Sequence, residues 1–197
     1  MCNDYEEHIL WKAYCEMMAK EALRIPSHQT ELDLQPVDHI RIADPAPIIR
    51  ATGRPDEVEL AAMRWSWAAP NGKPVFNFRS EGRSFGNSMR CLIPASAFFE
   101  FTGAKPPKTP HRFTLKGQPF MAIAGLWRPP TPPQSNEPPR FTMLTTEPGP
   151  DVAPYHSRQI AVLRPGDWAA WLYLTKPEAE LLGSLPLGSL EVGTESR

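Results

Sequence analysis

Proline sets the tightest limit on what this chain can fold into. It accounts for 24 of the 197 residues, about 12% against a usual ~5%. A proline inside a helix removes a main-chain hydrogen bond, and its ring clashes with the preceding turn, so long helices are excluded. We predict an α+β fold: a single domain over residues 1–197, with a mainly antiparallel, barrel-like β-sheet core and short flanking helices.

Apolar runs bounded by turn-forming residues indicate the strands, because their lengths and aromatic content are typical of strands rather than helices. A further strand edged by prolines is expected within residues 36–55. The six prolines of residues 128–140 predict a stiff, exposed excursion between two strands. The predicted strands are Glu59–Trp67, Pro74–Phe78, Cys91–Phe101, Arg112–Leu115, Phe120–Trp127, Arg140–Thr145 and Ile160–Leu163.

Helices are predicted at the two ends of the chain. Residues 5–23 place apolar side chains at helical spacing and stop before Pro26. Near the C-terminus, Asp167 can cap a helix through WAAWLYL, and Thr175 to Glu178 has the pattern of a capping box. We therefore expect residues 173–197 to form a helical segment and a tail.

Charge is divided unevenly along the chain. The net charge is −1 overall, but residues 64–164 hold 13 Lys and Arg against 5 Asp and Glu, a local +8. A basic middle permits an anionic partner such as nucleic acid, and it is equally typical of a solvated strand face.

Other features narrow the class of protein. The three cysteines are far apart, and the five histidines are scattered, so neither a disulfide framework nor a metal site is predicted, and no cofactor is expected. Cys15 and Cys91 are predicted to be small buried hydrophobes. No apolar run reaches the ~18 residues of a membrane span, and the acidic start is unlike a secretory signal. We expect a soluble, monomeric, cytoplasmic protein, nucleoid-associated if bacterial.

Cys2 is the position with the most distinctive chemistry. Removal of Met1 would give it an α-amine beside its thiol, and an α-amine has a pKa of about 7.7–8, so part of it is neutral at pH 7. Such an amine condenses with a carbonyl to a Schiff base. The neighbouring sulfur can then close onto the imine carbon to give a thiazolidine ring.

Seven short motifs follow in a fixed order. Taken together, they resemble the SRAP family, the SOS response-associated peptidase proteins, over about residues 2–172. The motifs are Met1-Cys2-Asn3, Arg64-Trp65-Ser66-Trp67, NFRSE from Asn77, RCLIPASAFFEF at 90–101, AGLW at 124–127, FTMLTTEP at 141–148 and His156-Ser157-Arg158.

The resemblance implies a function and a set of site residues. SRAP proteins cap abasic sites in single-stranded DNA through the N-terminal cysteine, so Cys2 would be the nucleophile. By the same resemblance, Asn77 would orient the N-terminus and the sugar, and Glu100 would act as acid and base. His156 would shuttle protons or hold a sugar hydroxyl. Arg79 and Arg158 would contact phosphates, and Trp65 or Trp67 would stack on a base.

Each residue also has a simpler interpretation. A carboxyl among phenylalanines is a candidate for a raised pKa, but the same pattern fits an exposed strand carboxylate. The simpler interpretations are a structural histidine for His156, a turn residue for Asn77, surface ion pairs for Arg79 and Arg158, and core packing for Trp65 and Trp67.

The chain departs from the family pattern at three places. Many members begin Met-Cys-Gly-Arg, whereas Asp4, Glu6 and Glu7 follow Cys2 here. These acidic side chains either point away from the DNA or weaken its binding. Gln159 and Ile160 replace a common Met-Pro, and Ser66 stands where glycine is common.

Three functions remain open from the sequence. The first is a protein that forms a covalent thiazolidine cross-link with abasic sites in single-stranded DNA. The second is a cysteine peptidase or amidohydrolase that uses Cys2 with His156, which needs an oxyanion hole. The third is a non-catalytic binder of single-stranded DNA with basic strands and stacking aromatics.

Overall fold

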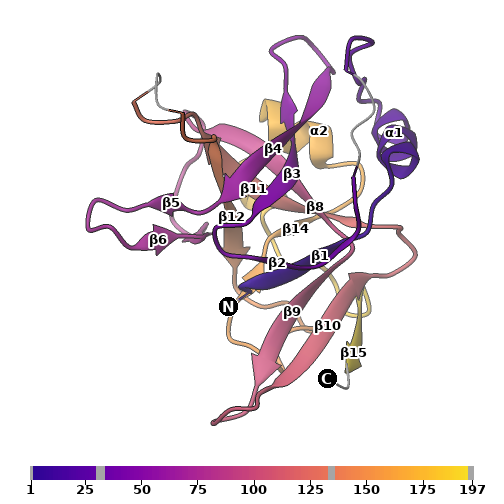
Figure 1. The fold of residues 1–197 in the computed structure, drawn as a ribbon. Helices are drawn as coiled ribbons and strands as arrows, with labels where there is room; N and C mark the ends of the chain where they lie inside the picture. The colour runs from indigo at the N-terminus through magenta and orange to yellow at the C-terminus, as the bar shows by residue number, and fades with distance from the viewer. Residues whose placement is uncertain (1, 30–33, 133–135, 195–197) are drawn as a thin grey trace.

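The computed structural model of the chain describes residues 2–29, 34–132 and 136–194 (Figure 1). Strands form most of it, and the helices are short, as the abundance of proline requires. The helices are α1 (Trp11–Lys20), α2 (Trp168–Tyr173) and α3 (Glu178–Leu181). Within the described ranges, none is long and apolar enough to cross a membrane.

A closed ring of strands forms the centre of the molecule, which confirms the predicted barrel-like α+β fold. In the described residues its order is β12–β4–β3–β8–β11, and β11 pairs back with β12. The pairs are antiparallel except β4 with β12, which is parallel. The short strands β7 (Asn77–Arg79), β13 (Gln159–Ile160) and β14 (Val162–Leu163) extend it. The ring strands are β3 (Pro45–Ala51), β4 (Val58–Trp65), β8 (Met89–Ala95), β11 (Met121–Arg128) and β12 (Arg140–Thr146).

A second sheet packs below the ring in Figure 1, in the order β15–β10–β9–β1–β2. Its strands are β1 (Asp4–Glu7), β2 (Val37–Arg41), β9 (Ala97–Thr102), β10 (Thr109–Leu115) and β15 (Leu190–Thr194). Only Ser96 separates β8 from β9, so the single strand predicted over Cys91–Phe101 is in fact two strands in different sheets. The hairpin of β5 (Trp67–Ala68) and β6 (Pro74–Val75) projects from the ring.

The N-terminal helix predicted over residues 5–23 is half wrong. Residues 4–7 form β1, whose four side chains are all buried and which pairs with both β9 and β2. The helix begins only at Trp11. Pairing on both edges within the sheet therefore outweighs the local helical pattern.

The predicted C-terminal segment needs two corrections. Helix α2 follows Asp167 as expected, but neither α2 nor α3 has a side-chain cap. The Glu178 carboxylate instead accepts a hydrogen bond from the Phe85 main-chain N–H at 2.7 Å, which ties α3 to the loop before β8. Residues 190–194 form β15 along β10 rather than a helical tail.

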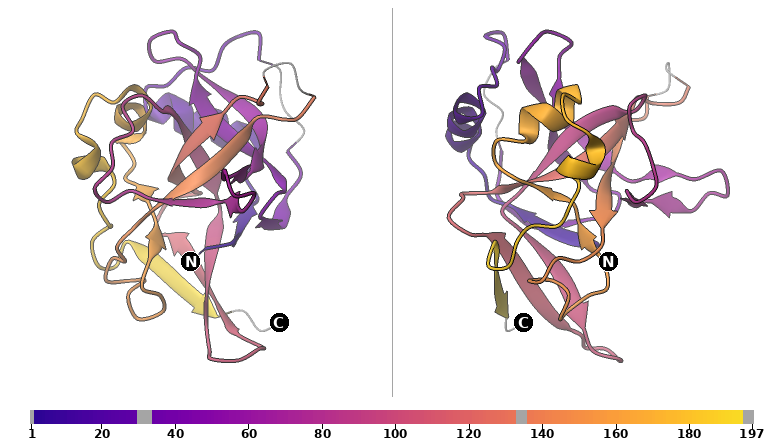
Figure 2. Two further views of the ribbon diagram at one scale, coloured as in Figure 1. Left: turned by 90° about the vertical axis from the view of Figure 1, so that its left-hand side faces the viewer. Right: turned by 180° about the vertical axis from the view of Figure 1, so that it is seen from behind.

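The core has two parts. One lies between the ring and the helices and contains Trp168 and Trp171. The other joins the ring to the second sheet and contains Cys2 and Trp65. Cys91 is buried as predicted, whereas Cys15 is only half-buried. Figure 2 shows α2 over one end of the ring and the second sheet at the other.

Candidate functional site

Glu100 lies on β9, the strand next to the start of the chain. β1 runs antiparallel to β9, with Tyr5 opposite Phe98 and Glu6 opposite Ala97. Because strands in register remain side by side, the residues before Tyr5 run along the end of β9. The Glu100 side chain is only 1% exposed, so the prediction of a desolvated carboxyl is correct and that of an exposed one is wrong.

Cys2 is held from three sides. Its side chain is 1% exposed, and its thiol donates a hydrogen bond to the Asp4 main-chain carbonyl at 3.4 Å. The side-chain amide of Asn77, on β7, donates to the Cys2 carbonyl oxygen at 2.7 Å. The main-chain nitrogen of Cys2 hydrogen-bonds the Glu100 carboxyl. Cys2, Asn77 and Glu100 come from distant parts of the sequence and meet here.

Burial controls the protonation of both acidic groups in this site. It raises the pKa of the Glu100 carboxyl above its usual range, and the charge of His156 and the Cys2 main-chain N–H oppose that shift only in part. Burial, together with the nearby charge of Glu100, raises the pKa of the Cys2 thiol. The thiol is therefore protonated at neutral pH, unlike an activated cysteine nucleophile.

His156 faces Glu100 from the loop before β13. Its Nδ1 accepts a hydrogen bond from the main-chain N–H of Arg158 at 2.9 Å, which leaves the proton of the neutral ring on Nε2. Nε2 lies 3.9 Å from the Glu100 carboxylate. The Arg158 carbonyl is also 2.9 Å from Nδ1, so a protonated ring would find an acceptor there. Both protonation states keep Nε2 toward Glu100.

The two arginines that were predicted to bind phosphate, Arg79 and Arg158, differ in exposure. Arg158 forms a bidentate ion pair with Glu81 at 2.7 and 2.9 Å and also donates to the Thr145 hydroxyl. Its side chain is 13% exposed. This pairing opposes a phosphate contact by Arg158 and supports its simpler interpretation as an ion-pair residue. Arg79, on β7 beside Asn77, is exposed.

The predicted stacking of a base on Trp65 is wrong. Trp65 is fully buried, its indole N–H donates to the Phe76 carbonyl at 2.9 Å, and its ring stacks with that of Phe141. Trp67 is 7% exposed, and the Arg128 guanidinium covers its ring at 4.2 Å. Neither ring presents an open face, so both serve the core, which is the usual place for a strand tryptophan.

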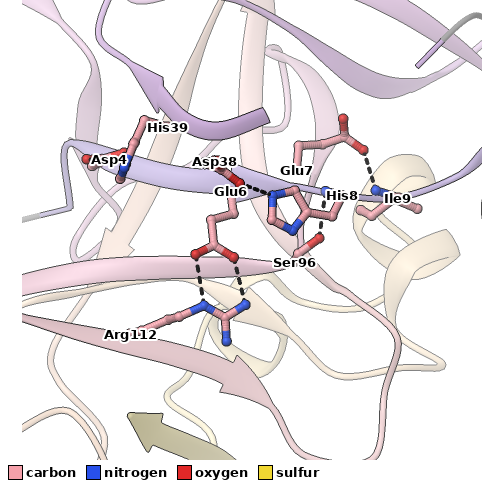
Figure 3. A network of polar contacts seen from close by, with 9 residues as sticks. All are labelled: Asp4, Glu6, Glu7, His8, Ile9, Asp38, His39, Ser96 and Arg112. Atoms are coloured by element: carbon pink, nitrogen blue, oxygen red, sulfur yellow. Dashed lines mark hydrogen bonds and ion pairs between the residues drawn. The ribbon is translucent and has the colours of Figure 1, made fainter. Parts of the chain in front are cut away.

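The acidic side chains after Cys2 are engaged within the protein (Figure 3). Arg112 of β10 binds both oxygens of Glu6, at 2.8 and 2.7 Å. The Glu7 carboxylate accepts hydrogen bonds from the Ile9 main-chain N–H and the Tyr14 hydroxyl. Both side chains are buried, which favours the first of the two alternatives, that Glu6 and Glu7 point away from the DNA.

A cleft of about 580 Å³ opens over this site. Asp4 is the member of the acidic trio that lines it, and both Asp4 oxygens lie 3.1 Å from Nδ1 of His39. Sequence reasoning missed the cations of the cleft, because no local motif shows which strands will meet there. The lining residues are Asn3, Asp4, Arg41, Ile42, Glu100, Phe101, Lys108 and His156.

Comparison with known families gives one match that spans nearly the whole chain. The model of the family described as SOS response associated peptidase (SRAP) matches residues 1–192. The chain belongs to the SRAP family. This confirms the resemblance drawn from the seven motifs and extends it to the C-terminal strand β15.

Curated relatives of this SRAP chain carry names that refer to DNA damage. The abasic site processing protein YoqW of Bacillus subtilis is 31% identical over 140 residues, which cover 64% of this chain and 62% of the relative. The abasic site processing protein YoaM of the same organism is 32% identical over 142 residues. The chain thus matches less than two thirds of the length of these relatives.

Solved structures share the fold of this SRAP chain. A protein from Bordetella bronchiseptica aligns over 100% of both chains with a TM-score of 0.73 at 22% identity. A protein from Bacteroides thetaiotaomicron aligns over 98% of this chain and 91% of its own with a TM-score of 0.70 at 19% identity.

The departures from the usual SRAP pattern have local structural consequences. Gln159 is buried on β13, and its side-chain carbonyl accepts a hydrogen bond from the Gly149 N–H at 2.7 Å. This contact braces the loop that carries His156. Ser66 adopts a φ of 83°, the left-handed region in which glycine is favoured.

Proposed function

We propose that this protein captures abasic sites in single-stranded DNA as a covalent thiazolidine, through Cys2 once Met1 is removed. One observation carries the proposal: the nitrogen that would become the α-amine hydrogen-bonds the Glu100 carboxyl. Amine, thiol and a buried acid therefore belong to one site. The names of the curated relatives support abasic DNA as the substrate.

The reaction begins with the sugar. An abasic deoxyribose exposes an aldehyde when its ring opens, and Glu100 holds or releases the proton that this opening needs. The neutral amine of Cys2 adds to the aldehyde carbon. Proton transfer from Glu100 to the resulting hydroxyl lets water leave, and a C=N bond remains.

Ring closure follows without any redox step. The Cys2 sulfur adds to the imine carbon, and the thiol proton passes to the imine nitrogen. One aldehyde and one aminothiol thus give one thiazolidine and one water. Because burial keeps the pKa of the thiol high, the sulfur reaches this step as a thiol that still carries its proton. His156, whose Nε2 faces Glu100, gives back the proton that the carboxyl has donated.

The cysteine hydrolase alternative fits the geometry less well. Such an enzyme activates its sulfur with a neighbouring base and a lowered pKa. Here the thiol donates to a main-chain carbonyl, and His156 Nε2 faces Glu100 instead.

Extension of the N-terminus tests the proposal. A variant with one glycine inserted before Cys2 keeps the thiol but moves the α-amine, so we expect no heat-stable cross-link to a single-stranded oligonucleotide with an abasic site. Cys2→Ser and Cys2→Ala keep the amine and should give an adduct only when borohydride reduces the imine.

Each alternative gives a different pattern in this experiment. A thiol-only hydrolase would tolerate the inserted glycine, and a simple DNA binder would give no adduct with any variant. Circular dichroism of each variant checks the fold. Should the extended protein cross-link as stably as the processed one, the aminothiol mechanism is excluded.

A further inference from the structure

Two cations stand on opposite sides of the cleft. Arg41 ends β2, and Lys108 directly precedes β10; both line the cleft over Glu100. In the sheet, β2 and β10 are the outer neighbours of β1 and β9. One cation therefore lies on each side of the strand pair that holds Glu100 and the start of the chain.

Arg41 makes only a long contact with the acidic residue beside it. Asp4 is its cross-strand partner, but the Arg41 Nε is 4.0 Å from the Asp4 carboxylate, the limit of an ion pair. His39 is closer to both Asp4 oxygens, at 3.1 Å. The Arg41 side chain stays 63% exposed, and its planar fork suits a phosphate. Lys108 is exposed as well.

We propose that Arg41 and Lys108 each bind one of the two phosphates that flank the reacting sugar, and so fix the direction of the strand across the cleft. This inference rests on the proposed function. Every deoxyribose in a strand has a phosphate on each side. A sugar held at Glu100 and His156 directs one phosphate toward β2 and the next toward β10.

The chemistry of the lesion gives these contacts their importance. An abasic nucleotide has no base to recognise, so its own backbone is what the protein can bind at that position, and phosphate contacts set register and orientation. The cleft is also lined by the acidic side chains of Asp4 and Glu100. The two cations offset the repulsion that the Asp4 carboxylate exerts on phosphate.

Binding to an unreactive substrate tests the two cations. The probe is a single-stranded oligonucleotide with one tetrahydrofuran residue, an abasic analogue that has no aldehyde. Arg41→Ala and Lys108→Ala should each weaken binding by roughly tenfold and reduce the slope of log K against log salt by about 0.7. Lys116→Ala, at the far end of β10 and exposed, is the matched control and should change neither.

Replacing one phosphate at a time with an uncharged analogue tests the direction of the DNA strand across the cleft. A methylphosphonate on the 5′ or the 3′ side of the analogue removes one charge at a time. In double-mutant cycles, Arg41→Ala should be coupled to one of these positions and Lys108→Ala to the other. Coupling of both cations to the same phosphate, or unchanged salt slopes in both variants, would overturn the proposal.

The outcome is separable from that of the proposed function. If the wild-type protein forms no cross-link with reactive abasic DNA, the proposed function fails, whatever the salt slopes are. If it cross-links while Arg41→Ala and Lys108→Ala bind the analogue as the wild type does, only the present inference fails.

Discussion

A buried carboxyl is the central residue of this site. Glu100 contacts the nitrogen of Cys2, faces Nε2 of His156, and has its pKa raised by burial. A carboxyl whose pKa is raised takes up a proton more readily than an exposed one and can deliver it to a leaving oxygen.

Replacement of Glu100 by glutamine removes the proton and keeps the shape. We expect cross-link formation to slow by roughly 10²–10⁴, the usual range for one acid–base group, and reversal to slow as well. Single-turnover kinetics on abasic single-stranded DNA measure both rates. Wild-type rates in both directions would contradict the role given to Glu100.

Ser66 is a second residue with a local consequence. Its φ of 83° strains any side chain with a Cβ. Ser66→Gly should therefore raise the free energy of unfolding by about 1 kcal/mol, less the entropy that glycine gains in the unfolded chain. Urea denaturation measures the change. A variant less stable than the wild type would show that the Ser66 side chain contributes more than its backbone strain costs.

Some residues of the site could be predicted from the sequence, and others could not. Cys2, Asn77, Glu100 and His156 lie in motifs whose order along the chain is informative, and the structure brings them together. Arg41 and Lys108 lie in no motif, since their proximity arises only from the order of strands in the sheet. Trp65 was misassigned because a motif gives no information on which side of a strand faces the core.

At the scale of elements, β1 shows how tertiary pairing decides local structure. Its sequence fits the start of a helix, yet its main chain is paired on both edges and its acidic side chains are bound by other elements. Sequence periodicity found most of the strands. It missed β1 and β15 because their partners are far away in the sequence.

Glu7 predicts how stability depends on pH. Burial raises the pKa of its carboxyl, so the native state holds this proton to higher pH than the unfolded chain does. Stability is therefore greatest below the unfolded pKa and falls as pH rises through the native pKa. Glu7→Gln keeps an oxygen for the Ile9 N–H and the Tyr14 hydroxyl. We expect it to match the wild type near pH 4 and to exceed its stability at pH 8.

Urea denaturation at several pH values measures this difference. Glu100, whose pKa is also raised by burial, contributes a slope of the same sign in both proteins. The Glu7 contribution is thus the divergence between the two curves. Parallel curves from pH 4 to pH 8 would contradict it.

Gly125 on β11 is required for close packing within the ring. A Cβ there would lie 2.6 Å from Cδ1 of Ile93 and 2.9 Å from the sulfur of Cys91. We expect Gly125→Ala to lower the free energy of unfolding by about 1–3 kcal/mol, as measured in urea. Gly193→Ala on β15, where a Cβ meets nothing within 4 Å, is the control and should be nearly neutral. Equal effects of the two changes would show that the ring tolerates the extra methyl group.

At the scale of the whole molecule, opposite charges are separated along the chain. The net charge is only −1, while residues 64–164 carry +8. Association with single-stranded DNA should therefore depend on a local basic surface and weaken with salt.

Substitution of Arg79, which lies beside the site, tests whether this basic surface binds DNA. Arg79→Ala should weaken binding to intact single-stranded DNA and reduce the salt slope by about 0.7. Lys20→Ala, at the end of α1 in the acidic N-terminal segment, is the matched control. Fluorescence anisotropy over a salt series measures both. A slope equal to that of the wild type in Arg79→Ala would place the phosphate path elsewhere.

The position of β1 has a consequence for the order of events during synthesis. The nitrogen of Cys2 is hydrogen-bonded to a carboxyl on β9, and the flanking strand β10 lies still later in the chain. Until the ribosome has made those strands, the N-terminus is exposed, and Met1 is open to an aminopeptidase. After they pair with β1, Cys2 is buried, with only 1% of it exposed. The maturation that we propose therefore belongs to the nascent chain, and a molecule that folds unprocessed stays so.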